Sequence, residues 1–176
     1  MTACYSISVP DAVISNCNLS SVEKEKYRFL DISQFLQSNQ FHLLAFDETT
    51  DASGQPVFGS IPRAAQPYAA LSYPWRDLKT LTSSPPPGFQ TTGLNPKEEP
   101  LTSIDVLTAV CTAAHNAGCK YLWMDKLCFR QDYDQEGIDD RAWQMKRMYN
   151  VYANCKVCLA AAGGMVRLPR LIDATS

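Results

Sequence analysis

Short apolar runs alternate with stretches of helical periodicity along most of the chain. Three of these runs have the length of buried strands, and each ends in polar or turn-forming residues. They are residues 68–73, 121–124 and 157–162. Ahead of the second run, Ile104, Leu107, Cys111 and Ala114 recur at spacings of three and four. This spacing predicts one face of a helix that Gly118 ends, with Thr102 or Ser103 as its cap.

A second helix is predicted between the last two runs. Its apolar stripe consists of Ile138, Ala142, Met145, Tyr149 and Tyr152, and we assign Met145 to the core. The order strand, helix, strand, helix, strand is typical of a parallel sheet with right-handed crossovers and helices on its faces. In such sheets functional groups gather beyond the carboxyl ends of the strands.

Residues 27–46 predict a further compact unit ahead of the first apolar run. Residues 27–30 have the pattern of a strand, and Asp31 or Ser33 is a candidate cap for a short helix. Residues 41–46 follow as a second strand. A turn-rich stretch then leads to the first buried strand, and a proline-rich connection follows it.

Composition narrows the class of protein. The chain has 176 residues, of which 45% are hydrophobic, and its net charge is −2. These values predict one folded domain and argue against nucleic-acid binding, because phosphate-binding domains usually carry a basic excess. No apolar run is long enough to span a membrane, and residues 1–10 lack the features of a signal peptide. We expect a soluble cytoplasmic protein.

The cysteines fit a reducing compartment. The chain has seven, an odd number scattered through apolar segments, so we expect free and mostly buried thiols. Cys155 and Cys158 have the spacing of a zinc pair, but residues three apart on a strand point to opposite faces. We therefore predict that no metal is bound.

Three sequence blocks carry a resemblance to a known family. They are YAALSYPW at 68–75, YLWMDKLCFRQ at 121–131, and WQM with MYNVYA within 143–153. Together with the lead-in RFLD at 28–31, they resemble in order and spacing the HET (heterokaryon incompatibility) domain of filamentous fungi. The resemblance covers about residues 27–165, which leaves 1–26 as an N-terminal extension and 166–176 as a tail. Arg76 and Lys126 stand where the family usually has glycine and serine.

The resemblance implies a module of fungal self/non-self recognition that triggers programmed cell death, through self-association or contacts with protein partners. HET domains are distantly similar to TIR domains, which implies an α/β, flavodoxin-like three-layer sandwich with a mainly parallel central sheet. Some TIR domains cleave NAD through a glutamate after the third strand, but residues 165–176 contain none. The family's usual downstream block, RxWTxQE, is also missing, so we expect a fragment or a shortened form whose sheet is incomplete at the C-terminus.

The resemblance and the strand ends together define candidate site residues. Asp125 is the candidate catalytic residue, because a carboxylate that ends an apolar strand needs donors or a ligand. It could bind a ribose hydroxyl or act as a base, or simply accept backbone hydrogen bonds. The candidate ligand-binding residues are Ser72, Tyr73, Trp75, Arg76, Cys128 and Gln131. No cofactor is expected, and NAD enters only as the substrate of a second hypothesis, a TIR-like nucleotide-cleaving enzyme that we expect to be almost inactive in this form.

Three further pairs have two interpretations each. Tyr73 and Trp75 could stack on a base or close the sheet edge. Cys128 and His115 could form a thiol–base pair, although a buried thiol and an exposed imidazole are favoured. Gly163–Gly164 could approach a phosphate, although a plain turn is favoured.

Overall fold

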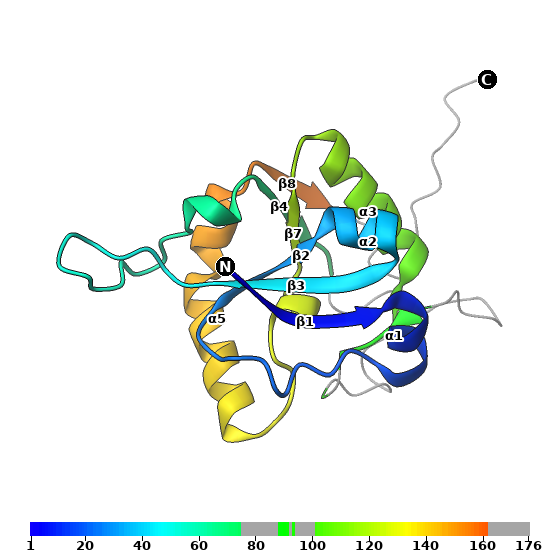
Figure 1. Cartoon of the computed structure of the whole chain (residues 1–176), viewed down its shortest axis with the longest axis horizontal. Helices are drawn as coiled ribbons and strands as arrows, with labels where there is room; N and C mark the ends of the chain where they lie inside the picture. The colour runs from blue at the N-terminus through cyan, green and yellow to red at the C-terminus, as the bar shows by residue number, and fades with distance from the viewer. Residues whose placement is uncertain (75–87, 92, 94–100, 162–176) are drawn as a thin grey trace.

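The computed structural model describes residues 1–74, 88–91, 93 and 101–161 (Figure 1). The elements are β1 (Thr2–Ser8), α1 (Val9–Ser15), β2 (Tyr27–Asp31), α2 (Ile32–Ser38), β3 (Gln40–Phe46), the 3-10 turn η1 (Arg63–Ala65), β4 (Tyr68–Ser72), β5 (Gly88–Phe89), β6 (Thr102–Ser103), α3 (Ile104–Asn116), β7 (Tyr121–Trp123), α4 (Asp125–Cys128), α5 (Gln135–Asn154) and β8 (Val157–Ala160).

Six strands form one mixed sheet in the order β1-β3-β2-β7-β4-β8. β4 pairs in parallel with β7 on one side and with β8 on the other, which confirms the three predicted parallel strands. β1, β3, β2 and β7 pair antiparallel, so the expectation of a mainly parallel sheet is wrong for this half. The connection explains the β2–β3 pairing, because only residues 32–39 separate the two strands and a parallel crossover needs a dozen or more.

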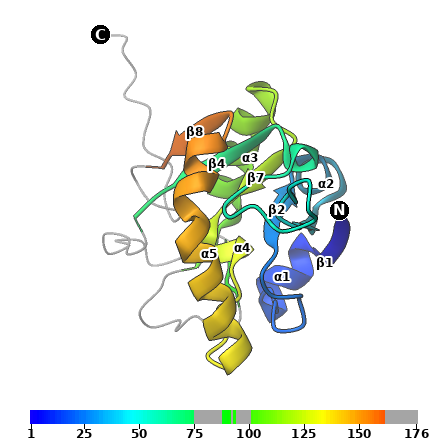
Figure 2. The same cartoon turned by 90° about the vertical axis from the view of Figure 1, so that its left-hand side faces the viewer.

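Helices cover both faces of the sheet (Figures 1 and 2). Residues of α1, α2 and α3 pack with one set of strand side chains into the larger core cluster. Val151 of α5, with half-buried Trp143 and Tyr152, packs into a second cluster on the opposite face. Strand alternation separates the two, since Leu122 belongs to the first cluster and Trp123 to the second. The α/β class is therefore correct.

Local capping follows the sequence closely. The Asp31 side chain caps α2 by accepting a hydrogen bond of 3.0 Å from the Gln34 N–H. Ser103 caps α3, and Gly118 follows the helix with a φ of 76°, which favours glycine. These three predictions are confirmed, because each depends on only a few neighbouring residues.

The apolar stripe predicted for α5 is wrong except at Tyr152, which packs against the second cluster. Ile138, Met145 and Tyr149 are 46%, 62% and 79% exposed. The residues of α5 that are buried are Gly137, Asp140, Gln144 and Val151. Polar residues occupy the inner face because they meet partners from distant segments: Asp140 binds Arg28, and Gln144 Nε2 donates to the Lys26 carbonyl at 2.7 Å.

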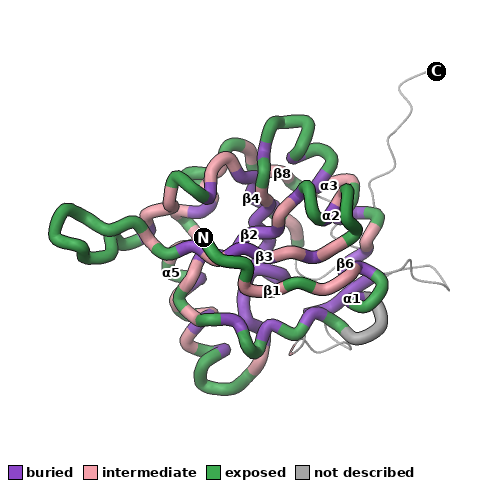
Figure 3. The backbone as a smooth tube through the Cα atoms, in the orientation of Figure 1, coloured by how far each residue is buried: buried purple, intermediate pink, exposed green. Residues whose placement is uncertain are grey.

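The N-terminal residues belong to the same sheet and core. β1 is an edge strand paired with β3 (Figure 3). Ala12 of α1 is fully buried among the core residues. β1 therefore forms one edge of the sheet, although the sequence places residues 1–26 in an N-terminal extension. Within the described part of the chain, no helix is long and apolar enough to cross a membrane.

All seven cysteines are free, and four of them are buried. The structure corrects one detail of the zinc argument. α5 continues to Asn154, so Cys155 caps the helix and lies ahead of β8 instead of within it. Cys158 is exposed on the strand.

Candidate functional site

The candidate site lies where β4 and β7 end. These two strands run parallel, so their carboxyl ends reach the same edge of the sheet. Tyr73 follows β4 and Asp125 follows β7, and the Tyr73 hydroxyl donates a hydrogen bond to Oδ1 of Asp125. The fold thus joins two of the predicted site residues that stand 52 positions apart.

Asp125 begins α4 and is 9% exposed. Its Oδ1 also accepts the Lys126 backbone N–H at 2.7 Å. Its main-chain carbonyl accepts the Phe129 N–H at 3.0 Å and Nε2 of Gln131 at 3.3 Å. Backbone hydrogen bonding to the carboxylate, one of the two interpretations of Asp125, is therefore present, and it orders the turn that follows β7.

Two phenols stay protonated near this carboxylate. Burial, reinforced by the charge of Asp125, raises the pKa of Tyr73 well above its ordinary value. Burial also raises the pKa of Tyr152 to about 12, again with a contribution from Asp125. The Tyr152 hydroxyl donates to the Leu71 carbonyl at 3.1 Å and so ties α5 to the end of β4. Both hydroxyls act as hydrogen-bond donors at neutral pH.

Lys126 is a component of the site that sequence reasoning treated only as a departure from the family pattern. It is buried, and its ammonium lies 5.6 Å from the centroid of the Tyr73 ring. Its main-chain carbonyl accepts the Thr91 hydroxyl at 2.6 Å. A lysine inside the apolar stretch 121–129 was the available signal, because lysine is rarely buried without a specific reason.

Gln131 belongs to a loop whose backbone lies very close to the backbone of Gly93. Gly93 has a φ of 105°, and a Cβ added there would lie 2.3 Å from the Gln131 carbonyl oxygen. Only glycine fits this position. The Gln131 side chain supports the Asp125 turn, as described above, so this predicted ligand residue sits beside the candidate carboxylate.

Cys128 lies apart from this group, in the second core cluster. It is fully buried, and its sulfur accepts the Met124 N–H at 3.5 Å. Burial raises the pKa of the Cys128 thiol to about 12, so the thiol is not ionised at neutral pH. His115 is exposed in the last turn of α3. The buried thiol and the exposed imidazole match the favoured interpretation, and no thiol–base pair forms.

Ser72 is the one remaining predicted ligand residue within the described part of the chain. Ser72 is the exposed last residue of β4, and its carbonyl accepts the Ala161 N–H at 2.9 Å. Trp75, Arg76 and Gly163–Gly164 lie outside the described residues.

A buried ion pair between Arg28 and Asp140 supports the turn that follows β7. Arg28 and Asp140 have no exposed side-chain surface and bind each other through Nη2 and Oδ2. Arg28 Nε donates to the Cys128 carbonyl at 2.7 Å, and the same Asp140 oxygen accepts the Arg130 N–H at 3.1 Å. The pair joins β2 and α5 to the loop after α4. Sequence reasoning missed it, although Arg28 stands in an otherwise apolar strand.

Arg130 forms a second charged cluster at the start of α5. Its guanidinium binds Asp132 at 2.7 Å, Glu136 at 3.0 Å and Asp134 at 3.4 Å. The hydrogen bond from Arg130 lowers the pKa of Asp132 to about 2. These contacts connect the loop between α4 and α5 to the first turn of α5.

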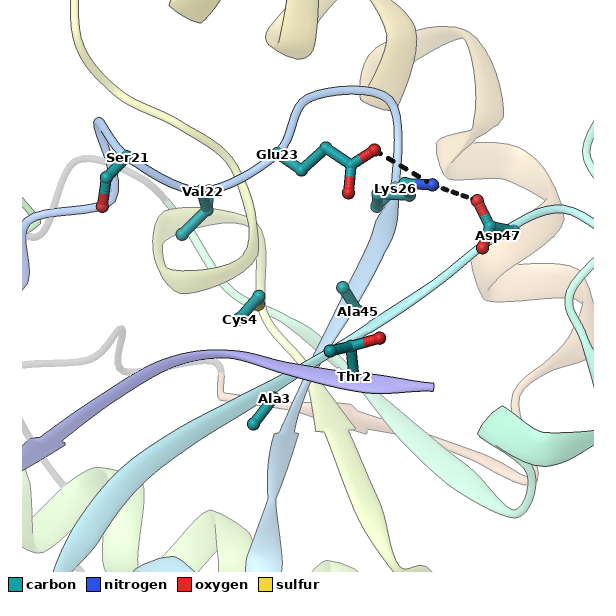
Figure 4. Close-up of a pocket in the computed structure, with 9 residues that line it drawn as sticks. All are labelled: Thr2, Ala3, Cys4, Ser21, Val22, Glu23, Lys26, Ala45 and Asp47. Atoms are coloured by element: carbon teal, nitrogen blue, oxygen red, sulfur yellow. Dashed lines mark hydrogen bonds and ion pairs between the residues drawn. The ribbon is translucent and has the colours of Figure 1, made fainter.

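A pocket lies elsewhere in the molecule, between β1, the end of β3 and residues 21–26 (Figure 4). Its volume is about 260 Å³, and Cys4 and Ala45 contribute to its wall. The Lys26 ammonium binds Asp47 and, at 3.2 Å, Glu23 at the rim. None of the predicted site residues lines it.

Within the described residues, no group of three or more His, Cys, Asp or Glu side chains is placed to hold a metal.

Comparison with protein families supplies one match. Residues 68–169 match the model of the family described as heterokaryon incompatibility protein (HET). No curated protein and no solved structure matches the chain. The matched region contains β4, β7 and α5, and with them Tyr73, Asp125 and Gln131.

Proposed function

The chain belongs to the heterokaryon incompatibility family, and we propose that it acts in the cytoplasm as a signalling module of fungal self/non-self recognition. In this proposal the module works by self-association or protein contacts, and its output is programmed cell death. The observation that carries the proposal is the family match over residues 68–169, which includes all three sequence blocks.

The contacts of the second block support a scaffold role. Asp125 is held by Tyr73 and by its own turn, and Gln131 binds the Asp125 carbonyl. Cys128 lies in the core. These side chains stabilise the turn after β7, so the block shapes the edge of the sheet and positions the start of α5. A shaped and rigid surface is what a module that works through protein contacts requires.

Inducible expression of this chain in a filamentous fungus tests the proposal. We expect loss of hyphal viability, measured with a vital dye, when the folded chain accumulates. Tyr73→Phe is expected to weaken the response because it removes the hydroxyl that holds Asp125. Tyr133→Phe is the matched control, since Tyr133 is exposed. Hyphae that stay viable while the folded wild-type chain accumulates would contradict the proposal.

A second candidate function is a TIR-like enzyme that cleaves NAD. The observation in its favour is the position of Asp125 beside Tyr73 at the carboxyl ends of two parallel strands. Cleavage of the bond to nicotinamide develops positive charge on the ribose, which a nearby carboxylate would stabilise. Here Asp125 would be that carboxylate, with Ser72 and the neighbouring strand ends contributing to nucleotide binding.

Nicotinamide release from NAD distinguishes the two candidates. We expect turnover far below about 1 per second, because the TIR-like glutamate has no counterpart in residues 165–176. Any genuine turnover should disappear in Asp125→Asn and persist in Asp105→Asn, a matched change at an exposed carboxylate in the first turn of α3. Fast release that depends on Asp125 would favour the enzyme.

A further inference from the structure

The outer face of α5 is unusually apolar for a surface helix. From Ile138 to Ala153, the exposed residues are Ile138, Ala142, Met145, Lys146, Tyr149 and Ala153. Only Lys146 among them is charged, whereas the solvent face of a helix normally carries polar side chains. We call Ile138, Ala142, Met145 and Tyr149 the α5 seam. The three large side chains of the seam, Ile138, Met145 and Tyr149, are all exposed.

The spacing of the α5 seam is that of a helix–helix contact. Its residues follow at intervals of four, three and four, the alternation of a and d positions in a coiled coil. This series reads the same in both directions along the helix. An antiparallel copy of the helix would therefore place Ile138 opposite Tyr149 and Ala142 opposite Met145, which sets a small side chain against a large one at the centre.

We propose that the α5 seam is a docking surface for the α5 seam of a second copy of this chain, packed antiparallel about a two-fold axis. The proposal rests on the proposed function in that it supplies the contact by which the module assembles. A two-fold contact uses the same patch on both copies, and the reversible spacing of the seam meets that requirement.

Charges beside the seam match the antiparallel arrangement. Asp139 and Lys146 lie two turns apart on the same flank of α5. In the antiparallel pair, Asp139 of one copy comes within about 3 Å along the axis of Lys146 of the other, and the two-fold axis repeats the contact. A parallel pair would instead set Ala142 against Ala142 and leave a gap between these two small side chains.

The free chain can release Asp139 for this contact. Asp139 binds Lys24 at 3.5 Å, and both side chains are substantially exposed. Exposed ion pairs contribute little free energy, so exchange of the partner costs little. The seam contains only four residues, well short of a standard interface, and we expect a dissociation constant on the order of tens of micromolar.

Sedimentation equilibrium of the purified chain from about 1 to 500 μM tests the contact, a range that brackets the expected dissociation constant. We expect a monomer–dimer equilibrium, and a monomer over the same range for Met145→Lys. Lysine is a good helix former, so this variant should keep its fold. Val57→Lys, at an exposed apolar position outside the α5 seam, is the matched control and should dimerise. A monomeric wild-type chain, or undiminished dimerisation of Met145→Lys, would overturn the proposal.

Charge reversal tests the orientation. Asp139→Lys should weaken dimerisation because it faces Lys146 of the second copy, and adding Lys146→Asp to the same chain should restore it. Restoration supports the antiparallel contact. A double variant that dimerises no better than Asp139→Lys overturns it.

Cross-linking tests the orientation independently in a Cys158→Ser background. Ile138→Cys and Tyr149→Cys chains should form disulfides when mixed, and Ile138→Cys alone should not, because its two copies would be about 16 Å apart. A cross-link between two Ile138→Cys chains overturns the antiparallel seam.

The viability assay separates this proposal from the function it rests on. A chain that is monomeric in solution but still kills hyphae overturns the α5 seam and leaves the proposed function in place. A chain that dimerises through the seam without killing supports the seam and contradicts the proposed function. Loss of both dimerisation and killing in Met145→Lys, with both retained in Val57→Lys, supports the two together.

Discussion

Asp140 and Asp125 are both buried carboxylates, but they are held in different ways. Asp140 has no exposed surface and binds the Arg28 guanidinium. Its other oxygen accepts the Glu25 N–H at 3.1 Å. These two donors come from β2 and the segment before it, more than 100 positions away in the chain, and the Arg130 N–H adds a third from the loop after α4. Asp140 therefore clamps distant elements together.

Asp125 lies beyond the carboxyl end of β7 and is held by groups that are nearer in the chain. Its Oδ1 accepts the Tyr73 hydroxyl and the N–H of the next residue. It is 9% exposed and lies at the carboxyl ends of parallel strands. These contacts order the turn after β7 and bind Asp125 to the residue that follows β4.

The difference shows how to sort buried carboxylates. Burial and an acidic side chain are common to both residues, so neither feature marks a functional site by itself. The type of partner and the place in the topology separate them. A guanidinium from another element at the centre of the fold indicates a structural clamp, whereas a phenol at the strand ends indicates a candidate site.

The largest expected effect is at the clamp. Asp140→Ala leaves Arg28 buried without its carboxylate, and we expect a loss of about 3–5 kcal/mol in the free energy of unfolding. Urea denaturation measures it. Asp139→Ala, at the adjacent position in an exposed pair, should cost less than about 1 kcal/mol. If Asp140→Ala and Asp139→Ala have the same stability, Asp140 is not a structural clamp and its contrast with Asp125 is wrong.

Replacing both Arg28 and Asp140 by apolar residues shows how much of the loss comes from the unpaired charge. Arg28→Met combined with Asp140→Leu removes both charges, so the double variant should recover part of the stability that Asp140→Ala loses. A double variant less stable than Asp140→Ala would show that the hydrogen bonds to the loop, and not the unpaired charge, dominate the loss.

A smaller effect is expected at the edge. Tyr73→Phe removes the hydroxyl donor from Asp125, and we expect a loss of about 1–3 kcal/mol because the carboxylate is buried. Thermal or urea unfolding measures the change. Tyr133→Phe alters an exposed hydroxyl and should stay within about 0.5 kcal/mol of wild type. A loss at Tyr73 as large as that at Asp140 would remove the distinction between the two carboxylates.

The smallest effect concerns Asp132, which is neither at the clamp nor at the edge. The hydrogen bond from Arg130 lowers its pKa to about 2 from an ordinary value near 4. A lowered pKa stabilises the fold above the ordinary value, and this contribution disappears as the pH falls from about 4 to about 2. The pair is partly solvated, so we expect about 1 kcal/mol.

Acid unfolding of Asp132→Asn measures this contribution. The variant should be less stable than wild type at pH 7, and the difference should vanish near pH 2. A difference that persists at pH 2 would mean that packing, and not the charge, explains the loss. Asp105→Asn, at an exposed carboxylate of another helix, serves as the control.

Much of the local structure could be predicted from the sequence. The parallel strands at 68–73, 121–124 and 157–162 were predicted from apolar runs, and Asp31 and Ser103 were identified as caps. These features depend on a few adjacent side chains. The approach of Tyr73 to the Asp125 carboxylate follows from the same parallel pairing, because parallel strands end at one edge.

The face of α5 could not be predicted in this way. The apolar spacing selected Ile138, Met145 and Tyr149 for the core, yet these residues are exposed. Asp140 and Gln144 are buried instead because Arg28 and the Lys26 carbonyl, far away in the chain, satisfy them. A hydrophobicity pattern contains no information about hydrogen-bond and ion-pair partners from distant segments, which only the folded chain brings close.

The amino-acid sequence alone determined the α/β class, the three parallel strands, the helix caps and the resemblance to the HET family, since each depends on local spacing or on motif order. Tertiary structure decided the antiparallel half of the sheet, the place of β1 at its edge, the burial of Lys126 and the side of α5 that faces solvent. The physical reason is that a buried polar group is stable only when distant donors and acceptors meet it, and the folded chain alone brings those groups together.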